Sequence, residues 1–176
     1  MRTILAACVL FVAGILGWFL SGCAGQPMGE THDIGTAAIN PVNEILDGFH
    51  AAAAKSDFEK YFAHWDEQSV FLGTDATERW TGKQFKEFAR PYFAKGQGWT
   101  YSPRDRRISI APDGRVAWFD ELLDNAKYGE CRGSGVVILQ GEAWKLVQYN
   151  LSIPMPNDLA GEFADRIRRW KKPHQE

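Results

Sequence analysis

The chain has 176 residues, of which 45% are apolar and 24% charged, with 20 basic and 22 acidic side chains. At this length one domain is the default. A near-neutral balance without a long basic run argues against nucleic-acid binding, which depends on a positively charged surface. Seven Trp, eleven Phe and five Tyr supply ample material for a packed core, so a chain that is disordered through most of its length is also excluded.

The first 22 residues have the features of an export signal. Arg2 is followed by an uncharged, mostly apolar run from Ile4 to Leu20, and a cationic start before such a run is typical of a secretory signal. The next residues complete Leu-Ser-Gly-Cys at positions 20–23, which resembles the lipobox of bacterial lipoproteins, where the bond before the cysteine is cleaved and the cysteine is lipidated. An uncleaved membrane anchor is the alternative, because the run is close to the minimum length that spans a bilayer.

Both interpretations place the rest of the chain outside the cytoplasm. We expect a signal peptide over residues 1–22, a tether over residues 23–38 and one domain over residues 39–172. Lipid on Cys23 would make the bilayer a partner of the protein, which would then reside in the bacterial cell envelope, on the periplasmic side in a Gram-negative cell. Cys131 would remain without a partner for an internal disulfide.

Helices are expected in the first half of the domain. Asn40-Pro41 has the features of a helix start, since Asn caps and Pro is favoured at the first helical position. Ser56–Glu59 and Thr81–Gln84 both have the spacing of a capping box, which predicts a short second helix and a longer third one. The apolar residues of the first and third helices recur at helical spacing: Ile45, Leu46, Phe49, Ala52 and Ala53, then Phe85, Phe88, Ala89, Tyr92 and Phe93.

Strands dominate the second half, where the apolar period changes to two. Asp113-Gly114 is the strongest hairpin turn of the chain, and Asn157 can cap a last helix. The expected strands cover residues 69–72, 107–111, 115–123, about 130–139 and 143–152. Helices that precede an antiparallel meander indicate an α+β domain.

The strand at 115–123 carries apolar side chains on both faces. One set is Val116, Trp118 and Leu122, and the other is Ala117, Phe119 and Leu123. One face must pack on the helices and the other on something else. Because an exposed apolar patch of this extent is unusual on a monomer, we hypothesise a homodimer through the open face of the sheet.

Several segments together resemble the SnoaL-like branch of the nuclear transport factor 2-like superfamily. They are Phe71–Trp80, Val116–Trp118, Trp144–Ser152 and Asn157–Ala160, and the resemblance covers about residues 40–165. It implies N-terminal helices packed in a strongly bent antiparallel sheet, the cystatin-like cone, with a cavity at its open end and a short C-terminal helix, often in a dimer. Such cavities host unrelated chemistries or none, so the fold alone does not settle the function.

Polar residues at positions that can face the cone are the candidates for ligand binding. Trp118 and Asp120 share one side of their strand, and so do Gln148 and Asn150, where a plain core would favour aliphatic residues. Arg132 lies on the strand between these two, and Tyr92 adds a hydroxyl from the aromatic helix. The expected ligand-binding set is Tyr92, Trp118, Asp120, Arg132, Gln148 and Asn150.

Asp120 is the candidate catalytic residue within this set. Buried among apolar walls, it can carry a proton; paired with Arg132, it stays ionised, as in a structural ion pair. The expected function is binding of a small, partly apolar ligand in the cone, with no reaction assigned. The alternatives are a proton-transfer enzyme resembling the ketosteroid isomerases, with Asp120 as base, and an envelope scaffold without ligand. No cofactor and no metal are expected, because His50 and His64 lack carboxylates at ligand spacing.

Overall fold

The computed structural model describes residues 34–171 of the chain, so the expected signal peptide, Cys23 and most of the tether lie outside the described residues. The elements in chain order are α1 (Ile34–Ala54), α2 (Phe58–Ala63), β1 (Trp65–Leu72), β2 (Arg79–Thr81), α3 (Gly82–Phe93), β3 (Ser102–Ile110), β4 (Val116–Asn125), β5 (Gly129–Gln140), β6 (Ala143–Ser152) and α4 (Asn157–Lys171). Between residues 34 and 171, no helix has the length and hydropathy that crossing a membrane requires.

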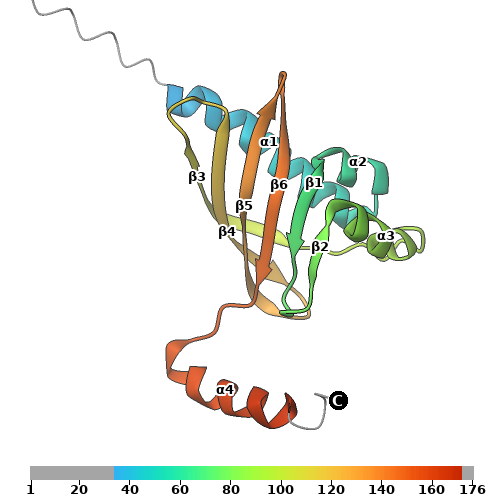
Figure 1. The fold of residues 1–176 in the computed structure, drawn as a ribbon, viewed down its shortest axis with the longest axis vertical. Coiled ribbons are helices and arrows are strands. Elements are labelled where there is room, and N and C mark those ends of the chain that lie inside the picture. Colours follow the sequence, from blue (N-terminus) through green and yellow to red (C-terminus); the bar gives the residue numbers. More distant parts are fainter. Residues whose placement is uncertain (1–33, 172–176) are drawn as a thin grey trace, which may run out of the picture. The chain divides into compact units, whose positions relative to one another are not determined.

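Six strands form one curved sheet in the order β2-β1-β6-β5-β4-β3 (Figure 1). Neighbouring strands are antiparallel, except for β1 and β6, which are parallel. Helix α1 crosses one face of the sheet and packs against β3 and β6, while α3 packs against β1. This confirms the expected α+β class, with helices packed in a bent and mainly antiparallel sheet. Helix α4 has no buried residue.

Local signals in the sequence predicted some boundaries better than others. Thr81 caps α3 with the reciprocal capping box to Gln84, as expected, and Gly114 has the positive φ of 69° that the turn between β3 and β4 requires. The expected start of α1 at Asn40-Pro41 is wrong, because the helix begins at Ile34 and contains Pro41. Proline is favoured in a first turn, but a helix can continue through it at a cost.

The cap of α2 is also displaced by one residue from its expected position. Ser56 has a φ of 55°, which is left-handed and so differs from the extended backbone of an N-cap. Asp57 takes the role, and its carboxylate accepts a hydrogen bond from the backbone N–H of Lys60 at 3.1 Å.

The core lies between the helices and the concave face of the sheet, and aromatic rings form most of it. Phe49 of α1 stacks on Tyr61 of α2, with 4.7 Å between ring centroids. Phe71 of β1 stacks on Phe85 of α3 at 4.0 Å. Aromatic pairs contribute beyond their buried area, so the first stack joins α1 to α2 and the second holds α3 against the sheet.

Candidate functional site

One set of side chains on β4 faces the interior and the other faces outward. The set that faces the interior is the opposite of the expected one. Ala117, Phe119, Glu121 and Leu123 are buried, whereas Trp118 is 49% exposed and Asp120 is exposed. Both faces of the strand carry apolar residues, so the alternation alone did not fix which set turns inward. Glu121, not Asp120, is the buried acidic residue of β4.

The neighbouring strands follow the same register. Asp120 pairs with Ser134, which pairs with Asn150, so these three residues share the outer face. Arg132 and Gln148 are exposed, and Asn150 is half-buried. The expectation that Trp118, Asp120, Arg132, Gln148 and Asn150 point into the cone is therefore wrong. An isomerase-like reaction with Asp120 as its base receives no support from this geometry.

A cavity of about 410 Å³ opens between the helices and the concave side of the sheet. Tyr92 lines it, as expected, and the other five predicted ligand-binding residues do not. The apolar and aromatic part of the wall comprises Phe49, Ala53, Tyr61, Phe71, Trp80, Phe85, Phe88, Tyr92, Trp99, Tyr101, Tyr128, Tyr149 and Leu151, and the polar part comprises His50, Gly73, Thr74, Glu78 and Lys127. A mainly apolar cavity of this size with few polar groups is typical of a small-molecule site.

Part of this wall is a stack of nearly parallel rings. The planes of Phe71 and Phe85 differ by 9°, those of Trp80 and Phe85 by 10°, and those of Trp80 and Phe88 by 26°. The rings stack on one another, so this part of the wall is aromatic and closely packed.

Tyrosine hydroxyls are the main neutral polar groups of the wall. Burial raises the pKa of Tyr149 and of Tyr61 well above the ordinary value of 10.0. Burial likewise raises the pKa of Tyr101 to about 12. These phenols stay protonated at neutral pH, so each retains an O–H that can donate a hydrogen bond.

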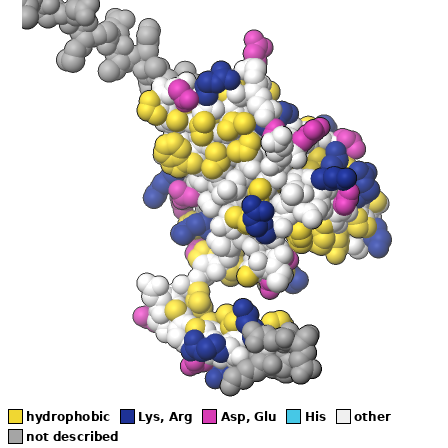
Figure 2. Space-filling model, viewed as in Figure 1, with side chains coloured by type: hydrophobic (Ala, Val, Ile, Leu, Met, Phe, Trp, Pro, Cys, Tyr) yellow, Lys and Arg dark blue, Asp and Glu magenta, His cyan; other side chains and the backbone are white. Residues whose placement is uncertain are grey.

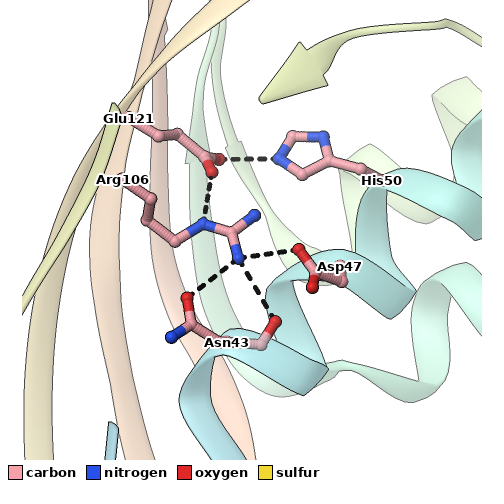
Figure 3. A network of polar contacts seen from close by, with 5 residues as sticks. All are labelled: Asn43, Asp47, His50, Arg106 and Glu121. Atoms are coloured by element: carbon pink, nitrogen blue, oxygen red, sulfur yellow. Dashed lines mark hydrogen bonds and ion pairs between the residues drawn. The ribbon is translucent and has the colours of Figure 1, made fainter. Parts of the chain in front are cut away.

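A buried polar network adjoins the cavity at His50 (Figure 3). Glu121 of β4 is fully buried, with a relative exposure of 0%. Its Oε1 lies 2.6 Å from Nε2 of His50 on α1, and its Oε2 accepts a hydrogen bond from Nε of Arg106 at 2.7 Å. Both carboxylate oxygens are thus satisfied, as a buried charge requires.

A bulge in β3 places Arg106 beside this carboxylate. Between the pairs Arg104–Leu122 and Arg107–Asp120, two residues of β3 lie opposite the single residue Glu121. Asp105, with a φ of 50°, absorbs the irregularity. Bulges of this kind redirect side chains and occur often beside active sites. Here the bulge turns Arg106 inward, where its guanidinium reaches α1.

Arg106 connects the sheet to α1 through a second set of contacts. Its Nη1 donates to Oδ1 of Asp47 at 2.8 Å and lies near both Oδ1 and the backbone oxygen of Asn43, at 3.2 and 3.3 Å. Asp47 is largely exposed, while Arg106 is 10% exposed. The charge-assisted hydrogen bonds at Glu121 are therefore better shielded from solvent than the pair of Arg106 with Asp47.

The ionised state of Glu121 determines which ring nitrogen of His50 donates the hydrogen bond. Burial raises the pKa of Glu121, but the hydrogen bonds and charges of His50 and Arg106 outweigh it and hold that pKa below the ordinary value of 4.5. An ionised carboxylate only accepts hydrogen bonds, so Nε2 of His50 must carry the proton that it donates to Glu121. Nδ1 of the same ring makes no hydrogen bond with any residue of the described part.

Sequence reasoning missed the residues of this network. His50 lacks carboxylates at the spacing of a metal ligand, but it lies between Phe49 and Ala53 on the apolar side of the first helix. That position, with a titratable group on a core-facing stripe, is the signal that marks it. Glu121 was hidden by the ambiguous alternation of its strand, and nothing in the sequence indicates the bulge that orients Arg106. Within residues 34–171, no group of three or more His, Cys, Asp or Glu side chains is arranged to hold a metal ion.

Comparison with known proteins identifies the family. The model of the SnoaL-like domain matches residues 42–156, so the chain belongs to the SnoaL-like family. Nothing matches among curated proteins.

Solved structures agree on the fold. A nuclear transport factor 2-like protein of unknown function from Pseudomonas putida is 13% identical, with a TM-score of 0.59, over 69% of this chain and 90% of that chain. A cystatin-like domain of unknown function from Nostoc punctiforme is 14% identical, with a TM-score of 0.61, over 74% and 85%. A proposed scytalone dehydratase from Novosphingobium aromaticivorans is 11% identical, with a TM-score of 0.58, over 70% and 88%. At these identities the likeness shows the fold alone.

The paired state of Glu121 predicts an acid-sensitive stability. Its pKa is lowered in the folded protein. The free energy by which the ionised carboxylate stabilises the fold is therefore fully present above the ordinary value of 4.5, and it is lost as the pH falls through the lowered value. At pH 7 we expect Glu121→Gln to lower the free energy of unfolding by about 3 kcal/mol, because Arg106 loses its buried counter-charge.

The measurement is urea unfolding of wild-type protein and variant from pH 7 down to pH 3. The difference between them should shrink below pH 4.5, since the variant lacks the titrating carboxylate. A difference that stays constant over this range would show that the charge of Glu121 is not what stabilises the fold.

Proposed function

We propose that this SnoaL-like domain binds a small, flat and mostly apolar molecule in its cone cavity. The observation that carries the proposal is the cavity of about 410 Å³ with its wall of nearly parallel rings. Such a volume accommodates a molecule of two fused rings, and contact with the wall would remove its apolar surface from water. The protonated phenols of the wall would orient a ligand that carries an oxygen acceptor.

An envelope scaffold without ligand would not require an open cavity in the cone. A cone whose own aromatic side chains fill it would offer no volume for a ligand, whereas this wall leaves a cavity of about 410 Å³ open. Ligand binding is therefore the function that the geometry supports better.

We expect 2-naphthol to bind the purified protein and to change its tryptophan fluorescence, because Trp80 and Trp99 line the cavity. Phe88→Ala should weaken this binding about fivefold, since an aromatic contact contributes about 1 kcal/mol. Phe88 is 41% exposed and stacks on Trp80 at 4.6 Å, so its removal leaves the deeper core in place.

Phe163→Ala on α4 is the matched control, because Phe163 is 40% exposed and does not line the cavity. Its affinity for 2-naphthol should equal that of the wild type. Absence of binding to the wild-type protein, or an equal loss in both variants, would contradict the proposed site.

We also propose that the domain is held at a membrane through lipid on Cys23, on the strength of the Leu-Ser-Gly-Cys pattern after an apolar leader. The variant Cys23→Ala should not reach the processed, lipidated form, because it lacks the thiol that accepts the lipid. Intact mass spectrometry of protein extracted from membranes checks this: the wild type should begin at residue 23 with added acyl mass. A wild-type chain that retains residues 1–22 without added mass would favour the uncleaved anchor instead.

A homodimer through the outer face of the sheet is the third part of the proposal. Hydrophobic side chains gather on this face in Figure 2, and Trp118 is the large aromatic among its exposed residues. Val116, Leu122, Val136 and Ile138 are half-buried beside it. A second copy would cover them by the same surface on both partners.

Sedimentation of the purified protein should therefore report a dimer at micromolar concentration, and Trp118→Glu should shift it to a monomer by placing a charge in the apolar interface. Leu159→Glu on α4, at a residue with 43% exposure, serves as the control and should leave the dimer intact. A monomeric wild type would refute this arrangement.

A further inference from the structure

We propose that α4 is a membrane-surface helix: its apolar side rests in the headgroup region of an anionic bilayer, and its arginine and lysine side chains bind the lipid phosphates. The apolar stripe of α4 comprises Leu159, Phe163, Ile167 and Trp170. None of these residues lines the cavity. The inference therefore concerns a second surface of the protein and goes beyond ligand binding in the cone.

The first support is that α4 is not part of the SnoaL-like fold. The matched SnoaL-like region ends at residue 156, just before the helix. The buried residues of the core cluster lie between Val42 and Tyr149, and α4 has no buried residue. Packing of the cone therefore does not explain why α4 carries large apolar side chains.

The second support is the shape and exposure of the stripe. Leu159, Phe163 and Ile167 recur every four residues and Trp170 follows after three. At about 100° per residue, the four side chains share an arc of about 80° on one side of the helix. Their exposed fractions are 43%, 40%, 49% and 60%. A continuous apolar surface of this kind is typical of an interaction site.

The third support is the arrangement of charge around the stripe. Arg166 and Lys171 border it, one on each side, and the acidic residues lie farther round the helix. These are Asp158, Glu162 and Asp165. On a membrane, cations at the edge of an apolar face extend their long side chains to the phosphates. Lysine is depleted in the cores of protein interfaces, whereas an anionic membrane surface attracts it. The pattern therefore favours a bilayer over a protein partner.

The ion pairs within α4 are weak enough for a phosphate to replace them. Arg166 lies 3.7 Å from Glu162, and both side chains are 64% exposed. Exposed pairs of this kind contribute little to stability. A lipid phosphate can therefore take the place of the carboxylate beside Arg166 without a large cost.

The dimensions of α4 indicate a helix that lies on the membrane and does not cross it. Its 15 residues span about 22 Å, which is less than the thickness of the hydrocarbon layer. A helix with an apolar stripe and a charged opposite side lies parallel to the surface. If lipid on Cys23 holds the chain at the same bilayer, α4 acts at a high effective concentration, and this second attachment limits how the cone turns about its tether.

The test is co-sedimentation with lipid vesicles. Residues 33–176 form one compact unit that includes every buried residue of the core cluster, and this unit omits the apolar leader, which would itself bind lipid. We expect it to bind vesicles of phosphatidylcholine and phosphatidylglycerol in equal parts, and to bind vesicles of phosphatidylcholine alone about tenfold more weakly. The same unit ending at residue 156 should bind neither. Its thermal unfolding should be unchanged, because α4 buries no residue.

Two variants that remove the same charge separate the arrangement of charges from their total. Lys171→Gln, at the edge of the stripe, should weaken binding to the phosphatidylglycerol vesicles about fivefold. Arg169→Gln is the matched control, because Arg169 lies on the polar side, about 120° from the middle of the stripe. It should lose less than about twofold, since its charge is roughly a Debye length farther from the lipid. Ile167→Gln should weaken binding about tenfold by removing apolar contact.

Three results would overturn the inference: no binding to the phosphatidylglycerol vesicles, equal binding with and without α4, or equal losses in Lys171→Gln and Arg169→Gln. A dimer that dissociates when the chain ends at residue 156, together with no vesicle binding, would assign α4 to a second copy and also overturn it. If the shortened unit does not fold, the three substitutions, all at exposed positions, still decide the matter. None of these outcomes bears on the binding of 2-naphthol in the cavity.

Discussion

The buried carboxylate of Glu121 is the constraint around which the interior of this domain is arranged. It has no access to solvent, and a charge in that position persists only if hydrogen bonds and opposite charge replace water. His50 supplies one bond from α1 and Arg106 supplies the other from β3. Because the partners come from different elements, satisfying one side chain also fixes how α1 lies across β3 and β4.

The same requirement explains the irregular part of the sheet. A regular β3 would leave one residue opposite Glu121, whereas the bulge provides two and turns Arg106 toward the carboxylate. Asp105 bears the unusual backbone that this needs, with its positive φ. On the other side of the core, stacked rings hold α3 against β1. Polar pairing thus fixes one wall of the cavity, and ring packing fixes the other.

The sequence predicted the structure correctly where a short local pattern is compatible with one conformation only. The capping box at Thr81–Gln84 and the turn at Asp113-Gly114 depend on residues within a few positions, and both formed as predicted. The resemblance of the longer segments led to the right fold class. The two local signals placed the start of α3 and the turn between β3 and β4 without any knowledge of what packs on them.

The candidate site was less predictable because its geometry depends on non-local choices. Strand β4 offers Trp118 on one face and Phe119 on the other, so large apolar side chains do not reveal the inward face. A small residue, Ala117, and a charged one, Glu121, share the buried side with Phe119, against the usual preference for plain hydrophobic alternation. The carboxylate becomes acceptable inside only when Arg106 and His50 arrive from distant parts of the chain.

The parallel pairing of β1 with β6 bears on the order in which the polypeptide acquires its shape. Phe71 pairs with Tyr149, so the ribosome makes one strand long before the strand beside which it settles. Contacts between such remote positions slow folding, since a large loop must close before they form. An incompletely synthesised chain therefore offers β1 only the three-residue β2 as a partner, and the cone closes only once its last strand exists.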